Sequence, residues 1–110
     1  MIEDRIRRLE STISAADDIP PERKTEVLGL LAQLKSRIEK LSETHDQDAA
    51  SITGLVEASA QEATRPEKKP GLLENSLDGL KQSARGFEAS HPELVESVNE
   101  FATVLANMGL

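Results

Sequence analysis

The sequence predicts an all-α protein in which helical hairpins form a bundle or a coiled-coil-like assembly. The first observation is that apolar residues recur at alternating spacings of four and three, which places them on one face of a helix. The clearest such stripe runs from Val27 to Leu41 and keeps the average spacing of 3.5 residues that is typical of a bundle seam. The second observation is that no segment shows the two-residue alternation of a half-buried strand.

Prolines and turn residues set the expected limits of each helix. Pro20 and Pro21 suit the first turn of a helix, where a missing backbone donor costs nothing. The third predicted helix is weak, because its apolar stripe consists largely of alanine. We therefore expect helices over about residues 2–15, 20–42, 48–63, 72–88 and 91–107.

A chain of 110 residues is expected to form a single helical domain, residues 1–110. Residues 1–44 and 72–110 are each predicted to form a helical hairpin. Residues 45–71 hold the weak helix and a Pro-rich linker between them. The pattern leaves open whether the two hairpins pack together within one chain or exchange between two chains.

The composition argues against several classes of function. A formal net charge of -7 disfavours binding to nucleic acid or to an anionic membrane surface. The lack of cysteine excludes disulfides, cysteine-bound metals and thiol nucleophiles. The sequence starts without a signal peptide and holds no apolar stretch of the roughly 20 residues that span a bilayer. A cytoplasmic location is therefore expected.

The apolar stripes suggest self-association, because one slender monomer is not expected to cover them all. We expect a homodimer or a homotetramer, and possible contact with another protein. The residues predicted to form the interface are Leu31, Leu34, Ile38, Leu41, Leu77, Leu80, Phe87 and Phe101.

Two segments fit the capping box, in which a side chain at the start of a helix bonds to a backbone amide three residues later. In the first, Ser90 is predicted to accept from the amide of Glu93, whose carboxylate reaches back to Ser90. The second runs from Thr44 to Gln47 and would precede the weak helix.

Catalytic and metal-binding readings are weaker than structural ones. His91 has no partner in the sequence besides Ser90, which the predicted cap already uses. An acidic cluster around His45 offers oxygen ligands for a hard cation, but its spacing is not that of a calcium loop. The cluster consists of Glu43, His45, Asp46 and Asp48. We expect no catalytic residue, no bound metal and no cofactor.

The end of the chain carries a recognisable phrase. Phe87–Leu94 reads FEASHPEL, and Leu105–Leu110 reads LANMGL. Both resemble the closing segment of DUF4404, a family of short bacterial proteins of unknown function. The resemblance is clear over the last two predicted helices, and residues 46–70 look like an insertion relative to shorter members. It implies a bacterial, cytoplasmic, helical protein and brings no activity with it.

Three functional hypotheses follow from these observations. The first is a non-enzymatic structural or interaction protein that self-associates through its apolar seams. The alternative is an adaptor that holds an amphipathic helix of a partner protein in a groove. The third is a metal-binding protein or an enzyme, which would need a tightly held ion or small molecule.

Overall fold

The computed structural model describes residues 2–109, and within them it contains five helices and no strand. The predicted all-α fold is therefore confirmed; Met1 and Leu110, the ends of the predicted domain, lie outside the described residues. The helices are α1 (Ile2–Ala15), α2 (Pro21–Ser42), α3 (Asp46–Ala63), α4 (Pro70–Arg85) and α5 (Pro92–Gly109).

Proline begins three of the helices, at Pro21, Pro70 and Pro92. At this position its fixed backbone angle already matches the helix and its missing amide hydrogen has no intrahelical partner. The predicted limits of α1 and of the end of α2 are confirmed. The fourth helix ends at Arg85, three residues early, because the following residues form tight turns closed by the amides of Phe87 and Glu88.

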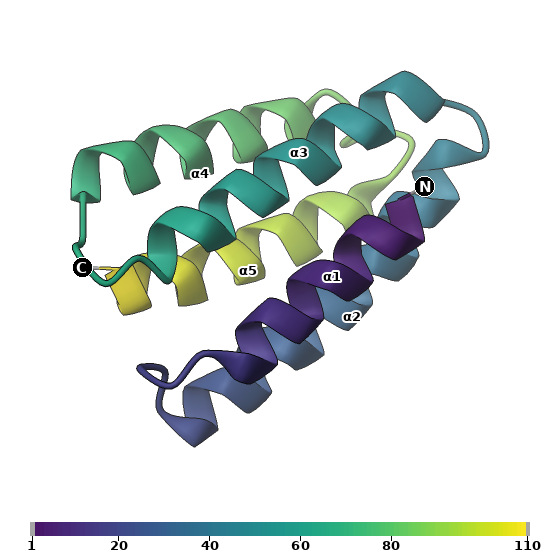
Figure 1. Ribbon diagram of the computed structural model, residues 1–110. Helices are drawn as coiled ribbons and strands as arrows, with labels where there is room; N and C mark the ends of the chain where they lie inside the picture. The colour runs from purple at the N-terminus through teal and green to yellow at the C-terminus, as the bar shows by residue number, and fades with distance from the viewer. Residues whose placement is uncertain (1, 110) are drawn as a thin grey trace.

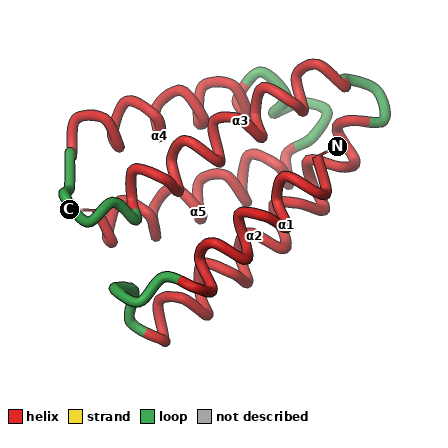
Figure 2. The backbone as a smooth tube through the Cα atoms, in the orientation of Figure 1, coloured by secondary structure: helices red, strands yellow, loops and turns green. Residues whose placement is uncertain are grey.

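Helices α2 to α5 form a closed ring of four antiparallel neighbours (Figure 1). Each packs on the next in chain order, and α5 returns to pack on α2, while α3 and α5 also touch across the centre. Short loops join the helices, as Figure 2 shows. The two predicted hairpins therefore pack on each other within one chain.

Helix α1 is a fifth element placed outside this ring. It packs on α2 and α3 and, among the described residues, on no other helix. In Figure 1 it lies along α2, with α3 on its other side. One stripe of α1 faces the bundle, and Ile6 and Ile13 on that stripe are fully buried. The bundle is therefore a four-helix unit with one helix added over a groove.

The helix that the sequence marks as weak is the centre of the molecule. Helix α3 contacts all four other helices, so the prediction that it merely bridges two hairpins is wrong. Its buried face is made of small or β-branched residues, which let neighbouring backbones approach closely. These residues are Ala49, Ile52, Thr53, Val56, Ser59, Ala60 and Ala63. The buried hydroxyl of Thr53 donates to the carbonyl oxygen of Ala49 at 2.8 Å.

The apolar faces of all five helices meet in one core. Among the described residues, Leu72 is the one large hydrophobic side chain that is exposed, at 47%. No helix among residues 2–109 combines the length and the apolar character that crossing a membrane requires.

Candidate interaction sites

The residues predicted to form an interface lie inside the core of a single chain. Phe87 alone is half-buried; the exposed fraction of the other seven is 5% or less. A second copy cannot reach these seven side chains while the bundle is closed, so in this conformation they cannot form the predicted interface. The seven are Leu31, Leu34, Ile38, Leu41, Leu77, Leu80 and Phe101.

The start of α5 differs from the predicted capping box. The helix begins at Pro92, one residue later than predicted, so His91 precedes the helix. The Ser90 hydroxyl makes no hydrogen bond to any described residue, and the carboxylate of Glu93 instead accepts from Arg37 on α2 at 2.6 Å. Glu93 therefore bonds to a cation on another helix and not to the backbone of Ser90. Sequence spacing alone does not show that cation.

Replacing Ser90 with alanine should therefore leave the stability almost unchanged, within about 0.5 kcal/mol as for ordinary surface substitutions. A capping hydroxyl would instead contribute about 1 kcal/mol. Thermal unfolding followed by circular dichroism separates the two outcomes, and a clear loss of stability would restore the capping box.

The second predicted capping box is also absent. Helix α3 begins at Asp46, its N-cap residue is His45, and no side chain caps it. Thr44, which was expected to cap the helix, instead shares a hydrogen bond of 2.8 Å between its Oγ1 and Nδ1 of His45. The hydroxyl therefore orients the imidazole rather than the helix start.

The two histidines of the chain meet at one end of the bundle. The ring centroids of His45 and His91 are 6.5 Å apart, and Phe87 lies 5.1 Å from His45 and 6.4 Å from His91. The three rings are steeply inclined to one another, as edge-to-face aromatic contacts prefer. The cluster joins the α2–α3 turn to the α4–α5 loop. The acidic residues around His45 form no group of three or more metal ligands among the described residues.

A small pocket of about 160 Å³ lies beside this cluster, between the last turns of α2 and the start of α5. Basic and hydroxyl side chains line much of it, and Glu93 is the one acidic residue among them. The lining residues are Arg37, Lys40, Ser90, His91, Pro92, Glu93 and Leu94. Ser90, His91 and Glu93 could be recognised from the sequence, but the two cations from α2 could not.

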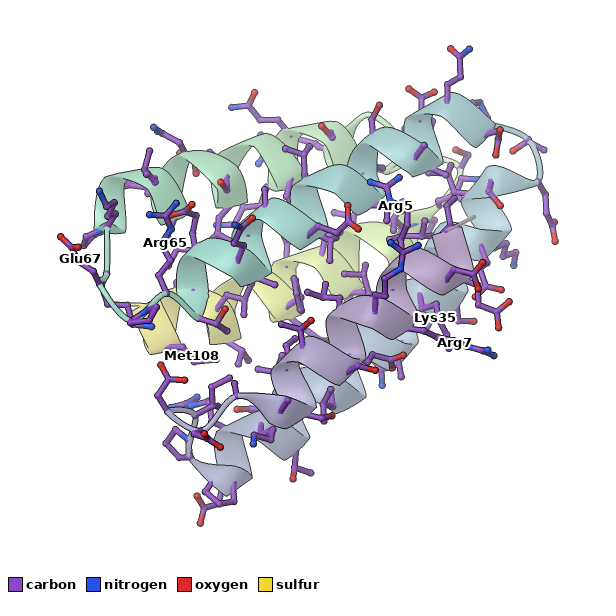
Figure 3. All side chains as sticks on the ribbon, viewed as in Figure 1. Arg5, Arg7, Lys35, Arg65, Glu67 and Met108 are labelled. Carbon is purple, nitrogen blue, oxygen red and sulfur yellow. The ribbon has the colours of Figure 1, made fainter. Side chains whose placement is uncertain are left out.

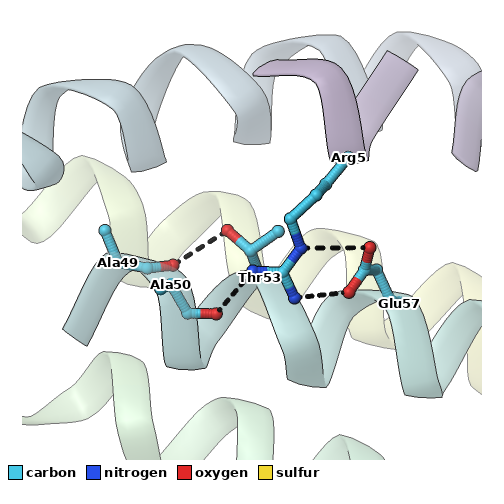
Figure 4. Close-up of polar contacts among 5 residues, drawn as sticks. All are labelled: Arg5, Ala49, Ala50, Thr53 and Glu57. Atoms are coloured by element: carbon cyan, nitrogen blue, oxygen red, sulfur yellow. Dashed lines mark hydrogen bonds and ion pairs between the residues drawn. The ribbon is translucent and has the colours of Figure 1, made fainter. Parts of the chain in front are cut away.

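A hydrogen-bonded ion pair joins α1 to the bundle. Arg5 points from α1 to α3, where its Nε and Nη2 donate to the two carboxylate oxygens of Glu57 at 3.3 and 2.6 Å (Figure 4). Its Nη1 lies 3.5 Å from the carbonyl oxygen of Ala50. In Figure 3, Arg7 by contrast projects away from the bundle; it pairs with Glu3 of its own helix.

Gly54 lies beside the Arg5 side chain. A β-carbon at this position would lie 3.5 Å from Nη2 of Arg5, which is an ordinary van der Waals contact, so alanine would fit here. The hydrogen bonds that Arg5 donates to Glu57 raise the pKa of Arg5, and the Coulomb attraction of the carboxylate acts in the same direction, while burial lowers that pKa. Both side chains are about one-third exposed, so the pair contributes about 1 kcal/mol, near the top of the range for exposed pairs.

Comparison with known proteins identifies the family. The family model for DUF4404, a domain of unknown function, matches residues 27–110. Comparison with curated proteins and with solved structures gives no significant match. The match extends the C-terminal resemblance back into α2 and spans residues 46–70, which hold the central helix α3. The chain therefore belongs to the DUF4404 family.

Proposed function

We propose that this protein is a non-enzymatic interaction protein whose four-helix bundle binds an amphipathic helix in the groove between α2 and α3. Helix α1 fills that groove in the free chain. The observation that carries the proposal is the placement of α1. It lies outside the family match and outside the closed ring of α2 to α5, and it packs on α2 and α3 alone.

The way α1 sits in the groove supports this function. Recognition of a helix in a groove uses side chains at spacings of three and four as anchors. Ile2, Ile6, Leu9 and Ile13 provide this spacing on α1. Ile6 and Ile13 are fully buried, and Ile2 and Leu9 pack against the core as partly buried residues. A partner helix would present the same stripe.

Charge adds selectivity to the proposed groove. Glu57 lies at its edge and pairs with Arg5 in two hydrogen bonds, in the planar geometry that favours arginine over lysine. A partner helix is therefore expected to carry an arginine one position before its first buried anchor, as Arg5 stands before Ile6.

The test is to weaken α1 without altering the groove. The full chain carrying Ile6→Ala and Ile13→Ala should lose about 2–5 kcal/mol per site in α1 anchoring, since both side chains are buried. A fluorescent peptide with the sequence of residues 1–16 should then bind it, as measured by fluorescence anisotropy. The unmodified chain should bind the peptide at least about tenfold more weakly, because its own α1 acts at the millimolar effective concentration of a short tether.

A charge exchange serves as the matched control. The peptide with Arg5→Glu should bind the weakened chain poorly, and Glu57→Arg in that chain should restore binding. The peptide with Arg7→Glu should bind like the unmodified peptide, since Arg7 is exposed and pairs only with Glu3. A weakened chain that keeps its helical circular dichroism and binds none of the peptides would refute the proposed function. If the double variant loses that signal, Ile13→Ala alone is used in the same test.

Self-association is the competing function. Two copies could associate by exchanging α1, since each α1 would then fill the groove of the other copy. The α1–α2 connection, residues 16–20, is short and contains Pro20, and short hinges of this kind favour exchange. Light scattering on a size-exclusion column across a dilution series separates the two functions. We expect a monomer, because the seam residues are buried within one chain. A stable dimer would support exchange of α1.

A further inference from the structure

We propose that the pocket between the end of α2 and the start of α5 binds a phosphate group. This site is independent of the α1 groove and lies on a different face of α2. Its ligand is defined by chemistry: an anion with several oxygen acceptors, small enough for a space of about 160 Å³.

Several hydrogen-bond donors in the pocket lining have no acceptor in the part of the chain that the structure describes. Nε of Arg37 is buried and has no hydrogen-bond partner. Lys40, Ser90 and the ring of His91 make no hydrogen bond or ion pair with any described residue. Several donors from two segments of the chain therefore surround one hollow without being used. Lys40 and Ser90 are exposed and His91 is half-buried, so their donors are free to meet an acceptor in the pocket, whereas Nε of Arg37 has almost no accessible surface.

The displaced cap adds one more donor. In the predicted capping box the amide of Glu93 would bond to Ser90, but that bond does not form, and the first turn of α5 offers this amide no intrahelical acceptor. An amide at a helix N-terminus favours an anion. Here this amide adds to the donors of Lys40, Ser90 and His91 and does not define the site by itself.

The local charge also favours an anion. Two cations, Arg37 and Lys40, line the pocket and face a single carboxylate, that of Glu93. The chain as a whole carries a formal charge of -7, whereas cationic side chains outnumber the one carboxylate in the lining of this pocket. The carboxylate of Glu93 rests on Nη1 of Arg37 at 2.6 Å, with its side chain 61% exposed. It can swing into solvent when a phosphate takes its place.

The pocket is too small to enclose a drug-sized molecule. At about 30 Å³ per water molecule, the pocket holds roughly five waters, whereas pockets for drug-sized molecules measure about 300–1,000 Å³. A phosphate group fits this space, and the rest of any larger ligand would remain in solvent. The group can come from free phosphate or from a phosphorylated side chain.

The experiment titrates the full chain with inorganic phosphate at fixed ionic strength, with sodium chloride as the reference. Amide NMR shifts of residues 90–94 report on the pocket. We expect saturable shifts for phosphate and none for chloride. Lys40→Gln should weaken binding about tenfold, as expected for one charge-assisted hydrogen bond. Lys35→Gln, the same change one and a half turns earlier on α2 and outside the pocket lining, should leave it unchanged.

Glu93 gives a second test with the opposite sign. Glu93→Gln removes the carboxylate that competes for Arg37 and should tighten phosphate binding several-fold, while Glu96→Gln on the same helix should have little effect. Equal effects of Lys40→Gln and Lys35→Gln would mean general charge screening and would overturn the site. Absence of phosphate-specific shifts, or weaker binding by the Glu93→Gln variant, would overturn it as well.

Two peptides distinguish the sources of the phosphate. A short peptide with one phosphoserine is compared with its unphosphorylated form. Binding of the phosphopeptide more tightly than inorganic phosphate, with no response to the unphosphorylated peptide, assigns the pocket to modified side chains. Equal affinity for phosphopeptide and inorganic phosphate assigns it to the free ion. Both results support a phosphate site, and a response to the two peptides alike contradicts it.

Discussion

Phe101→Ala is expected to lower the free energy of unfolding by about 3–5 kcal/mol, a large fraction of the roughly 5–15 kcal/mol that stabilises a domain of this size. Phe101 is fully buried and is the largest side chain in the core. It lies on α5, which packs on α2, α3 and α4, so the cavity left by alanine would open at the centre of the ring. Urea unfolding followed by circular dichroism measures the loss.

Phe87→Ala is the matched control, because it removes the same side chain from the α4–α5 loop. Phe87 is half-buried beside His45 and His91, so we expect a smaller cost, about 1–2 kcal/mol. Urea unfolding at two protein concentrations shows whether Phe101 stabilises the core of one chain or an interface between copies. An interface role for Phe101 would give a folded protein whose midpoint depends on concentration. A core role gives the same loss at both concentrations.

Ala60→Leu is expected to destabilise the protein by about 1–3 kcal/mol through overpacking. Ala60 is 1% exposed and lies on the face of α3 that meets the rest of the bundle. Leucine is a better match to the apolar pattern of a helix, so a pattern-based argument predicts the opposite sign. Urea unfolding by circular dichroism checks which argument holds.

Gln61→Leu provides the comparison for that substitution. Gln61 is the next residue on α3 and is exposed, so the added bulk meets solvent and the effect should stay within about 0.5 kcal/mol. A stabilising effect of Ala60→Leu would mean that α3 sits loosely among its neighbours. In that case the small residues on its buried face would not be needed for close packing.

The contrast between α2 and α3 shows how far sequence reasoning reaches. The seam from Val27 to Leu41 predicts α2 correctly, because large apolar side chains at spacings of three and four mark a buried face whatever the partner is. The same rule underrates α3, since it weighs residues by size and hydrophobicity. A helix surrounded by four others needs small side chains such as Ala49 and Ala63, and these carry little pattern.

The residues predicted to form an interface illustrate a related point. A stripe shows that Leu34 or Leu80 is buried, but it does not say which surface covers it. The sequence alone was consistent with a second copy as the covering surface, and the structure places the other helices of the same chain there. The apolar faces of the five helices meet in one core, which covers within one chain the seams that separate hairpins would leave open.

The candidate sites depended on the fold even more strongly. Proposals around Ser90, His91 and Glu93 could be made from adjacent positions in the chain, but the pocket also needs Arg37 and Lys40. No signal in the sequence joins these two cations to the start of α5, since α2 and α5 are brought together only by packing.

The sequence by itself determined the helical class, the limits of α1, the end of α2 and the membership in DUF4404, since each of these rests on residues near one another in the chain. The tertiary structure decided the central place of α3, the closed ring, and the contact between Arg5 and Glu57, which are 52 residues apart. The physical reason is that local periodicity fixes which face of a helix avoids water. Which helix covers that face, and which charges then meet, depends on how all five helices fill one volume together.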